Sequence, residues 1–573
     1  MDQEVAQFVP RHAPVKITHL RLTNTGARQR HLSLFAYARL VMGVLPSDSG
    51  RFVTTEYDAD ANALMARNRL NNEFSTAVVF AAAVTPNGAA AQFTGDRTAF
   101  IGRNGSAAAP AALCDATALD QHTGAGLDPC ATAQVTVEIA PGATIECAFL
   151  LGETTDDESA RTLIERYRRR GALDHALTEV RAFWQHTLSA VQVHTPSLAI
   201  DVMVNGWLLY QGLSCRLWGR SAFYQSGGAF GFRDQLRDSA ALIYTRPDLT
   251  RAQIVLHVAH QFVEGDVLHW WHPPTNRGIR TRFADDLVWL PYIVAFYVRT
   301  SGDWSVLDES AGFMTARALV PGEDEAYLHP APSRETADVY AHCCRALDRS
   351  LTGGAHGLPL MGTGDWNDGM NRVGREGRGE SVWMGFFLYR VLDEFIPICA
   401  RRADDARVAR YRAYQLGRRD RAATLLEMLG PVHHSRTADQ VAIYQVEPYV
   451  VAADIYGISP HVGRGGWTWY TGSAGWMYRV ALESVLGLRL EGGTLLRLAP
   501  CIPDHWTGFR LRYRATDGAP QYEIEVRNPT SNAAAVIAVT IDGKPGVIDG
   551  GAACIPVRTD GSTHQVCVTL GAE

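Results

Sequence analysis

The hydrophobic pattern of this chain changes period twice, and this change constrains the fold more than any other feature of the sequence. Within residues 1–155, Val15–Leu22 alternates apolar and polar residues, and Thr144–Leu151 is a short apolar run behind a Pro-Gly turn. Helical periodicity dominates residues 197–490, and strand patterns return after them. We therefore predict a multidomain α+β protein in which β-domains flank a helical domain.

The predicted domain boundaries follow these changes of pattern. Residues 1–155 are predicted to form an N-terminal β-sandwich whose first strands are truncated, and 156–196 a charged helical linker. Residues 197–490 form the helical domain, and 491–573 a small C-terminal β-domain. Several domains are also expected because 573 residues exceed what one hydrophobic core usually organises.

Composition excludes several classes of partner. The chain is 46% hydrophobic and 20% charged, which is typical of a globular protein, and its formal net charge is -6 without a long basic run. Nucleic acid and anionic membranes are therefore disfavoured as partners. No apolar stretch reaches the roughly 20 residues of a membrane helix, so no membrane insertion is expected. Ten cysteines without CxxC pairs indicate reduced thiols and a cytoplasmic location.

A glycine-rich loop at 361–371 carries the most informative chemistry. Asp365 and Asp368 flank Trp366 in this loop. Paired carboxylates beside an aromatic platform are typical of glycoside cleavage, in which one acid protonates the leaving oxygen. The alternative is a turn in which the Asp side chains only cap neighbouring helices, and the loop alone leaves both interpretations open.

Three further loops favour a sugar site when they are taken together. Residues 269–286 combine aromatic side chains with three arginines and two aspartates, and 231–238 alternates charges at a predicted helix start. Residues 465–475 lead into a helix, where Thr471 and Gly472 offer the hydroxyl and N–H groups of an anion site. Each loop alone is also explained by core packing or capping. No metal site is expected, because adjacent histidines at 433–434 lack a third ligand at a suitable spacing.

Long motifs within four segments resemble glycoside hydrolase family 94, the inverting cellobiose- and chitobiose-phosphorylase type. The similarity is greatest to the phosphorylase-like C-terminal region of cyclic β-1,2-glucan synthases. The segments are 219–238, 264–292, 356–383 and 446–479. The resemblance implies an N-terminal β-sandwich, a helical linker, an (α/α)6-barrel and a small C-terminal β-domain.

The resemblance also implies a reaction. Asp368 would be the general acid that protonates the glycosidic oxygen, while inorganic phosphate attacks the anomeric carbon and releases α-glucose 1-phosphate with inversion. Implied partners are a β-glucan, with β-1,2 linkages expected, and inorganic phosphate as co-substrate; no cofactor is expected, and a homodimer is left open. Arg233, Asp238 and Trp366 would line the transferred glucose, Arg280, Asp286, Glu447 and Tyr449 would add sugar contacts, and Thr471 and Gly472 would hold phosphate.

The chain departs from the family between Asp368 and Thr471, where family members carry a much longer segment. The junction of this internal deletion is predicted near 413–417, so the barrel is expected to be shortened. A family motif with a phosphate-binding histidine is also missing from the sequence. Three interpretations stay open: an active phosphorylase with a rebuilt pocket, a non-catalytic glucan-binding remnant, or an internally deleted product that is unstable alone.

Overall fold

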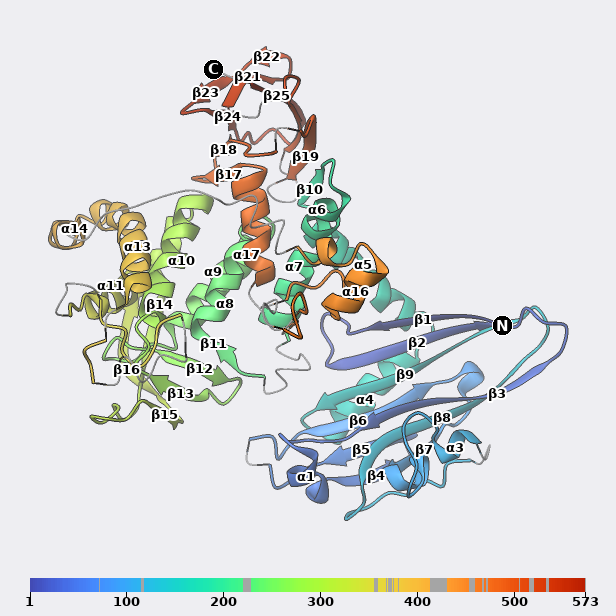
Figure 1. The fold of residues 1–573 in the computed structure, drawn as a ribbon. Coiled ribbons are helices and arrows are strands. Elements are labelled where there is room, and N and C mark those ends of the chain that lie inside the picture. The colour runs from blue at the N-terminus through green and yellow to red at the C-terminus, as the bar shows by residue number, and fades with distance from the viewer. Residues whose placement is uncertain are drawn as a thin grey trace. The chain divides into compact units, whose positions relative to one another are not determined.

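The computed structural model divides the chain into two compact units, Met1–His186 and Thr187–Glu573, each described by itself (Figure 1). The predicted junction at 413–417 and the predicted phosphate residues Thr471 and Gly472 lie outside the described residues. The described residues are all of 1–573 except 72, 115–117, 220–227, 355–358, 367, 369–373, 375, 380, 413–429, 453–458, 466–467, 470–472, 504, 515–519, 532–534 and 572–573.

The first unit is built on two antiparallel sheets that enclose a hydrophobic core. Leu22, Phe93, Val135 and Phe149 come from both sheets and meet in this core. The three-stranded sheet has the order β3 (Arg30–Arg39), β8 (Pro129–Ile139), β7 (Gln92–Asp96). The six-stranded sheet has the order β1 (Asp2–Phe8), β2 (Val15–Thr23), β9 (Thr144–Thr154), β6 (Val78–Val84), β5 (Ala63–Arg67), β4 (Thr54–Asp58). The strands predicted at 15–22 and 144–151 are therefore present as β2 and β9.

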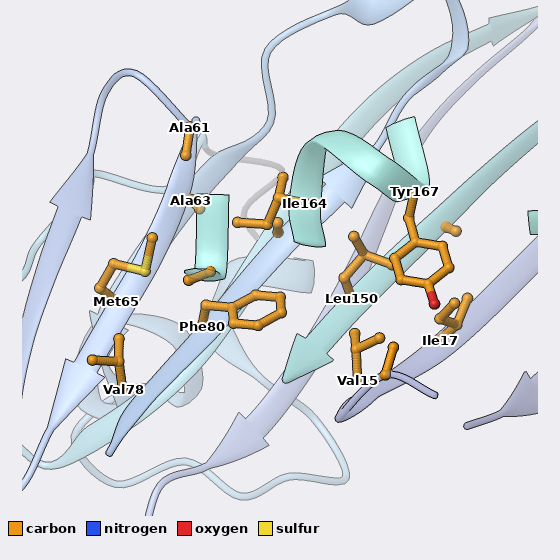
Figure 2. Packing of buried hydrophobic residues seen from close by; sticks show 14 of the residues in the cluster. Val15, Ile17, Ala61, Ala63, Met65, Val78, Phe80, Leu150, Ile164 and Tyr167 are labelled. Atoms are coloured by element: carbon orange, nitrogen blue, oxygen red, sulfur yellow. The ribbon is translucent and has the colours of Figure 1, made fainter. Parts of the chain in front are cut away.

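Two helices cover the other face of the six-stranded sheet. They are α4 (Asp157–Arg168), which begins at an Asp156 cap, and α5 (Ala172–Leu188). Ile164 and Tyr167 of α4 pack on Ile17, Phe80 and Leu150 (Figure 2). Since successive side chains of a strand point to opposite faces, β2 and β9 supply both cores of this unit. The helices that the sequence assigns to a linker thus pack on the sandwich.

The helices of the second unit gather around α10 (Asp286–Ser301), which contacts α8, α9, α11 and α13. Twelve of the sixteen residues of α10 are buried and most of these are apolar, which is typical of a helix surrounded by other helices. The closed (α/α)6-barrel stays a prediction. The other helices are α6 (Leu198–Val202), α7 (Leu208–Gln211), α8 (Phe232–Ser239), α9 (Pro247–Val258), α11 (Val339–Ser350), α13 (Val382–Arg401), α14 (Asp405–Arg412), α16 (Ala438–Tyr444) and α17 (Ser473–Arg479).

Short strands interrupt this helical region, and the sequence analysis missed them. One sheet has the order β11 (Phe230–Gly231), β12 (Leu268–His272), β13 (Arg277–Thr281), β15 (Glu325–Leu328), and a hairpin pairs β14 (Ser310–Thr315) with β16 (Ala331–Asp338). These strands are short and rich in charged or aromatic residues, so they show no clear apolar alternation. They include β12 and β13, which lie in one of the loops singled out for function.

The C-terminal strands form two sheets, as the return of a strand pattern after the helical region predicts. The six-stranded sheet also contains β10, which lies within the predicted linker and pairs antiparallel with β19. The six-stranded order is β10 (Val191–His194), β19 (Gly508–Arg514), β20 (Gln521–Arg527), β25 (Thr563–Gly571), β21 (Ala535–Ile541), β22 (Lys544–Pro545). The four-stranded order is β17 (Leu488–Glu491), β18 (Leu495–Leu498), β24 (Ala552–Pro556), β23 (Val547–Asp549).

Two further observations concern the whole described chain. All ten cysteines are free thiols. Within the described residues, none of the helices combines the length and the apolar character needed to cross a bilayer.

The core beneath α4 gives the first prediction. Phe80 is fully buried there, so we expect Phe80→Ala to lower the free energy of unfolding by about 3–5 kcal/mol, through lost burial and the cavity left behind. Urea unfolding of the full chain measures this loss. Phe74→Ala is the matched control because Phe74 is exposed, and it should change stability little. Equal losses in the two variants would contradict the packing described.

Candidate active site

The loop that carries Asp368 is fixed by its backbone to the segment that precedes α10. Thr363 N donates to Arg282 O at 3.3 Å, and Ala284 N donates to Gly364 O at 2.9 Å. Gly362 has a φ of +64°, and a Cβ there would lie 1.8 Å from Arg282 O, so this approach requires glycine. Backbone hydrogen bonds thereby pair residues 282–284 with residues 362–364, about eighty positions later in the chain.

Arg233 stands at the centre of the group that this arrangement creates. It lies in the first turn of α8, and its side chain is only 10% exposed. Nη1 donates to Asp285 Oδ2 at 3.2 Å and to the Asp365 carbonyl at 3.0 Å, while Nη2 donates to Asp368 Oδ1 at 2.5 Å. The Asp368 side chain is 55% exposed. One buried cation therefore joins a buried carboxylate to an exposed carboxylate.

The two aspartates of the loop have different roles in the structure. Asp365 is buried, and its Oδ2 accepts a hydrogen bond from Ser381 Oγ, the side chain that caps the start of α13. Asp365 therefore binds the serine that caps α13 and does not itself cap that helix. Asp368 instead presents its carboxylate at the surface beside Arg233, as a group that donates a proton to a ligand must.

Trp366 provides an aromatic face next to these carboxylates. Its residue is 43% exposed, and the guanidinium carbons of Arg233 and Arg237 lie 5.3 and 4.8 Å from its ring centre. Trp289 of α10 lies behind it at 6.0 Å and donates from Nε1 to Asp285 Oδ2 at 3.1 Å. Half-exposed aromatic faces of this kind suit the C–H face of a sugar ring.

Asp238 binds two arginines next to this group of residues. Its carboxylate is buried and accepts from Arg237 Nε at 3.1 Å and from Arg216 Nε at 2.6 Å. Because Arg237 also faces Trp366, Asp238 is linked to the site through a neighbouring arginine.

Two acidic residues at the start of α10 have contrasting surroundings. Asp285 is fully buried; burial raises the pKa of its carboxyl to about 7, although the Arg233 charge opposes this shift and Asp286 adds to it. Asp286 Oδ2 lies 2.8 Å from His269 Nδ1. Burial works to lower the pKa of His269, but the charge and hydrogen bond of Asp286 outweigh it, so the pKa is raised. Asp286 Oδ1 is buried and has no hydrogen-bond partner among the described residues.

The remaining predicted residues lie in other surroundings. Arg280 is buried, and all five of its N–H groups have protein acceptors: Asp266, Glu264 and the carbonyls of Ala316 and Arg317. Glu447 accepts from Trp469 Nε1 at 3.0 Å, and the Tyr449 ring stacks on Trp207 with centres 4.4 Å apart. Among the described contacts, none joins these three predicted residues to the Arg233 group.

The sequence analysis missed four residues of the group: Asp285, His269, Trp289 and Arg237. Asp285 and Trp289 are four positions apart, which places a carboxylate and an indole on one helix face, and this spacing could have revealed the pair. The same spacing relates Arg233 and Arg237. For His269 the sequence carries no such signal.

Comparison with known proteins agrees with the motifs. The description "Glycosyl hydrolase 94, supersandwich domain" matches residues 1–170, and "Glycosyl hydrolase 94 superfamily, catalytic domain" matches 183–415 and 413–487. The two catalytic segments meet where the sequence analysis expects the junction.

Three relatives extend this result. The cyclic beta-(1,2)-glucan synthase NdvB of Rhizobium meliloti (strain 1021) is 34% identical over 94% of this chain, which spans only 23% of that protein. The N,N'-diacetylchitobiose phosphorylase of Vibrio furnissii is 23% identical, with 98% of this chain and 85% of that protein covered. The solabiose phosphorylase of Paenibacillus borealis is 24% identical, with 98% and 84% covered.

Among solved structures, a putative kojibiose phosphorylase from human microbiome is similar at a TM-score of 0.49 and 8% identity, covering 97% of this chain and 84% of its own. The family models together match most of the chain, across both the sandwich and the helical region. They confirm the resemblance that the motifs indicated. The chain therefore belongs to the glycosyl hydrolase 94 superfamily.

Proposed function

We propose that this carbohydrate-active protein is an inverting phosphorylase that cleaves or forms β-glucosidic bonds with inorganic phosphate and α-glucose 1-phosphate. The observation that carries the proposal is the exposed Asp368 carboxylate, held by the buried Arg233 beside the half-exposed Trp366. This is the equipment for protonating a glycosidic oxygen while a sugar ring rests on an aromatic face.

The residues of the group suit one acid and an external nucleophile. Arg233 holds Asp368 Oδ1, so Oδ2 is the atom we assign to the proton delivered to the leaving oxygen. Inorganic phosphate is already an anion and needs no base to activate it, so a second catalytic carboxylate is unnecessary. Asp365 is engaged with Ser381, which agrees with a single catalytic acid.

Sugar recognition is assigned to the groups around this acid. Trp366 offers its half-exposed face to a sugar ring, and Asp286 keeps the sugar-contact role that the family resemblance implies. Arg233 and Asp238 keep the roles that the family resemblance implies, and Thr471 with Gly472 keeps the phosphate role. A β-1,2-linked glucan is the proposed substrate, supported by the identity to a protein named cyclic beta-(1,2)-glucan synthase.

A specific observation favours a second candidate, a glucan-binding protein without turnover. The matches to the relatives run over 660 and 721 positions, more than the 573 residues of this chain, so the relatives carry inserted segments that this chain lacks. The catalytic-domain match also breaks into two pieces at 413–415. If the segment lost there held phosphate, sugar binding would survive without phosphorolysis.

Replacement of the proposed acid tests the reaction. We expect Asp368→Asn to lower the phosphate-dependent release of glucose 1-phosphate from short β-1,2-glucans by about 10²–10⁴-fold, because an amide cannot donate the proton. Glucan affinity should stay close to that of the unaltered protein. Release is measured with and without inorganic phosphate, and affinity by calorimetry on the same protein.

Asp308→Asn is the matched control, because Asp308 is also an exposed carboxylate, 2.6 Å from Arg402. It should leave the rate unchanged. A folded, glucan-binding protein that releases no glucose 1-phosphate would favour the second candidate. An unchanged rate in Asp368→Asn would remove Asp368 from the acid role.

The raised pKa of Asp285 gives a prediction about stability. The folded protein keeps this proton until about pH 7, whereas an unfolded chain releases it at about pH 4, so the folded state binds more protons between these values. The contribution of Asp285 to the free energy of unfolding therefore falls as the pH rises from about 4 to about 7. Asp285→Asn should remove this slope in urea unfolding measured across that range, while Asp308→Asn should keep it. A constant offset between the Asp285→Asn variant and the unaltered protein would contradict the assignment.

A further inference from the structure

Two carboxylates and two arginines at α8 form a largely buried network of four charges. Asp238 accepts from Arg216 Nε at 2.6 Å and from Arg237 Nε at 3.1 Å. Asp234 lies one turn earlier on α8, with its Oδ2 3.6 Å from Arg216 Nη1 and its Oδ1 3.8 Å from Arg237 Nη2. Each arginine therefore lies between both carboxylates, and the four formal charges cancel.

Arg237 also contacts the aromatic face of the candidate active site. Its guanidinium carbon lies over the Trp366 ring, 4.8 Å from the ring centre, nearer than the guanidinium carbon of Arg233 at 5.3 Å. A cation within about 6 Å of an indole centre is attracted to the ring face, most strongly when the cation is desolvated. Arg237 is only 6% exposed, so its attraction to Trp366 is of the strong kind.

The low exposure of Arg237 indicates an indirect role in the site. A buried guanidinium that already faces two carboxylates offers little surface to a sugar or to phosphate. Among the described residues, none of the hydrogen bonds or ion pairs joins Arg237 to Asp368, whereas Arg233 binds Asp368 directly. Arg237 thus contacts the aromatic part of the site without contacting the acid.

A guanidinium group suits this position better than an ammonium group. Its planar fork is held when Nε and Nη2 face different carboxylates, here Asp238 and Asp234. A planar cation also stacks on an aromatic face, whereas a lysine ammonium is a point charge on a flexible stem. Because Trp366 is half-exposed, a fixed cation against its ring restricts how the indole can turn.

We propose that Arg237 is a positioning residue, which fixes the Trp366 indole in the orientation that receives a sugar ring. The role of the sugar rests on the proposed function, whereas the contact between Arg237 and Trp366 does not. Asp234 and Asp238 hold the guanidinium, and the guanidinium holds the indole. Loss of Arg237 therefore weakens glucan binding and leaves proton transfer from Asp368 in place.

The first experiment observes the indole without any ligand. The full chain is labelled with fluorotryptophan, and the fluorine NMR resonance of Trp366 is assigned through Trp366→Phe. We expect Arg237→Met, which keeps much of the side-chain length but removes the charge, to shift this resonance. The matched control is Arg402→Met, because Arg402 lies 5.5 Å from the Tyr340 ring centre and 2.6 Å from Asp308. It should leave the resonance unchanged, and an unchanged resonance in Arg237→Met would overturn the proposal.

The second experiment measures glucan affinity in a double-mutant cycle. Calorimetry with a short β-1,2-gluco-oligosaccharide, without phosphate, compares the unaltered chain, Arg237→Met, Trp366→Ala and the double variant. We expect Arg237→Met to weaken binding by about 3- to 30-fold. It should have no further effect once Trp366 is alanine, because Arg237 acts through that ring. Equal losses in both backgrounds would assign Arg237 to the general fold and reject the positioning role.

Arg237→Lys covers the case in which the methionine variant does not fold. It keeps a positive charge beside Asp234 and Asp238 but loses the planar fork. The folded lysine variant should therefore show a shifted Trp366 resonance and a weaker glucan affinity. Full affinity together with an unshifted resonance would contradict the proposal.

The outcome can be separated from that of the proposed function. In phosphorolysis, Arg237→Met should raise KM for the glucan while kcat changes little. A shifted Trp366 resonance in a chain that releases no glucose 1-phosphate would sustain the positioning contact and reject phosphorolysis. Release by the unaltered chain, without coupling between Arg237 and Trp366, would do the reverse.

Discussion

The rest of the site depends on the buried guanidinium of Arg233. A buried cation is stable only when it is paired and hydrogen-bonded, and Arg233 meets this demand with Asp285, the Asp365 carbonyl and Asp368. These partners come from the start of α10 and from the acid loop, while Arg233 itself comes from α8. One charge therefore gathers three distant parts of the chain, and loss of it would leave Asp285 without its cation.

Backbone contacts also hold the acid loop against the segment before α10. Gly362 accepts the close approach of Arg282, and the hydrogen bonds at 363 and 364 continue the pairing up to Asp365. A side chain at 362 would force the two segments apart. The position of Asp368 is thus set by a short backbone pairing and by one arginine.

The sequence alone predicted the features that depend on a local pattern of residues. The alternation in β2 and the apolar run in β9 gave strands, and the motif around Trp366 gave the residues that the structure places beside Arg233. The sequence could not predict which side chains that are distant in the chain meet in the fold. The sequence does not distinguish the neighbouring residues Asp285 and Asp286. In the described structure, Asp285 accepts hydrogen bonds from Arg233 and Trp289. The resemblance assigned Arg280 to sugar contacts, but all five of its N–H groups donate to protein acceptors. The local sequence does not reveal that an arginine is buried in this way.

The proposed acid, Asp368, and the residues assigned to phosphate are far apart in the chain. The described contacts that position Asp368 come from α8, the segment before α10 and the acid loop, all of which precede residues 413–415, where the family match breaks. The residues assigned to phosphate follow that break in the chain. An active phosphorylase and a glucan-binding remnant would therefore share the same acid, the same arginine and the same aromatic face. They differ in whether an anion is held opposite Asp368, which makes phosphate binding the property that decides the function.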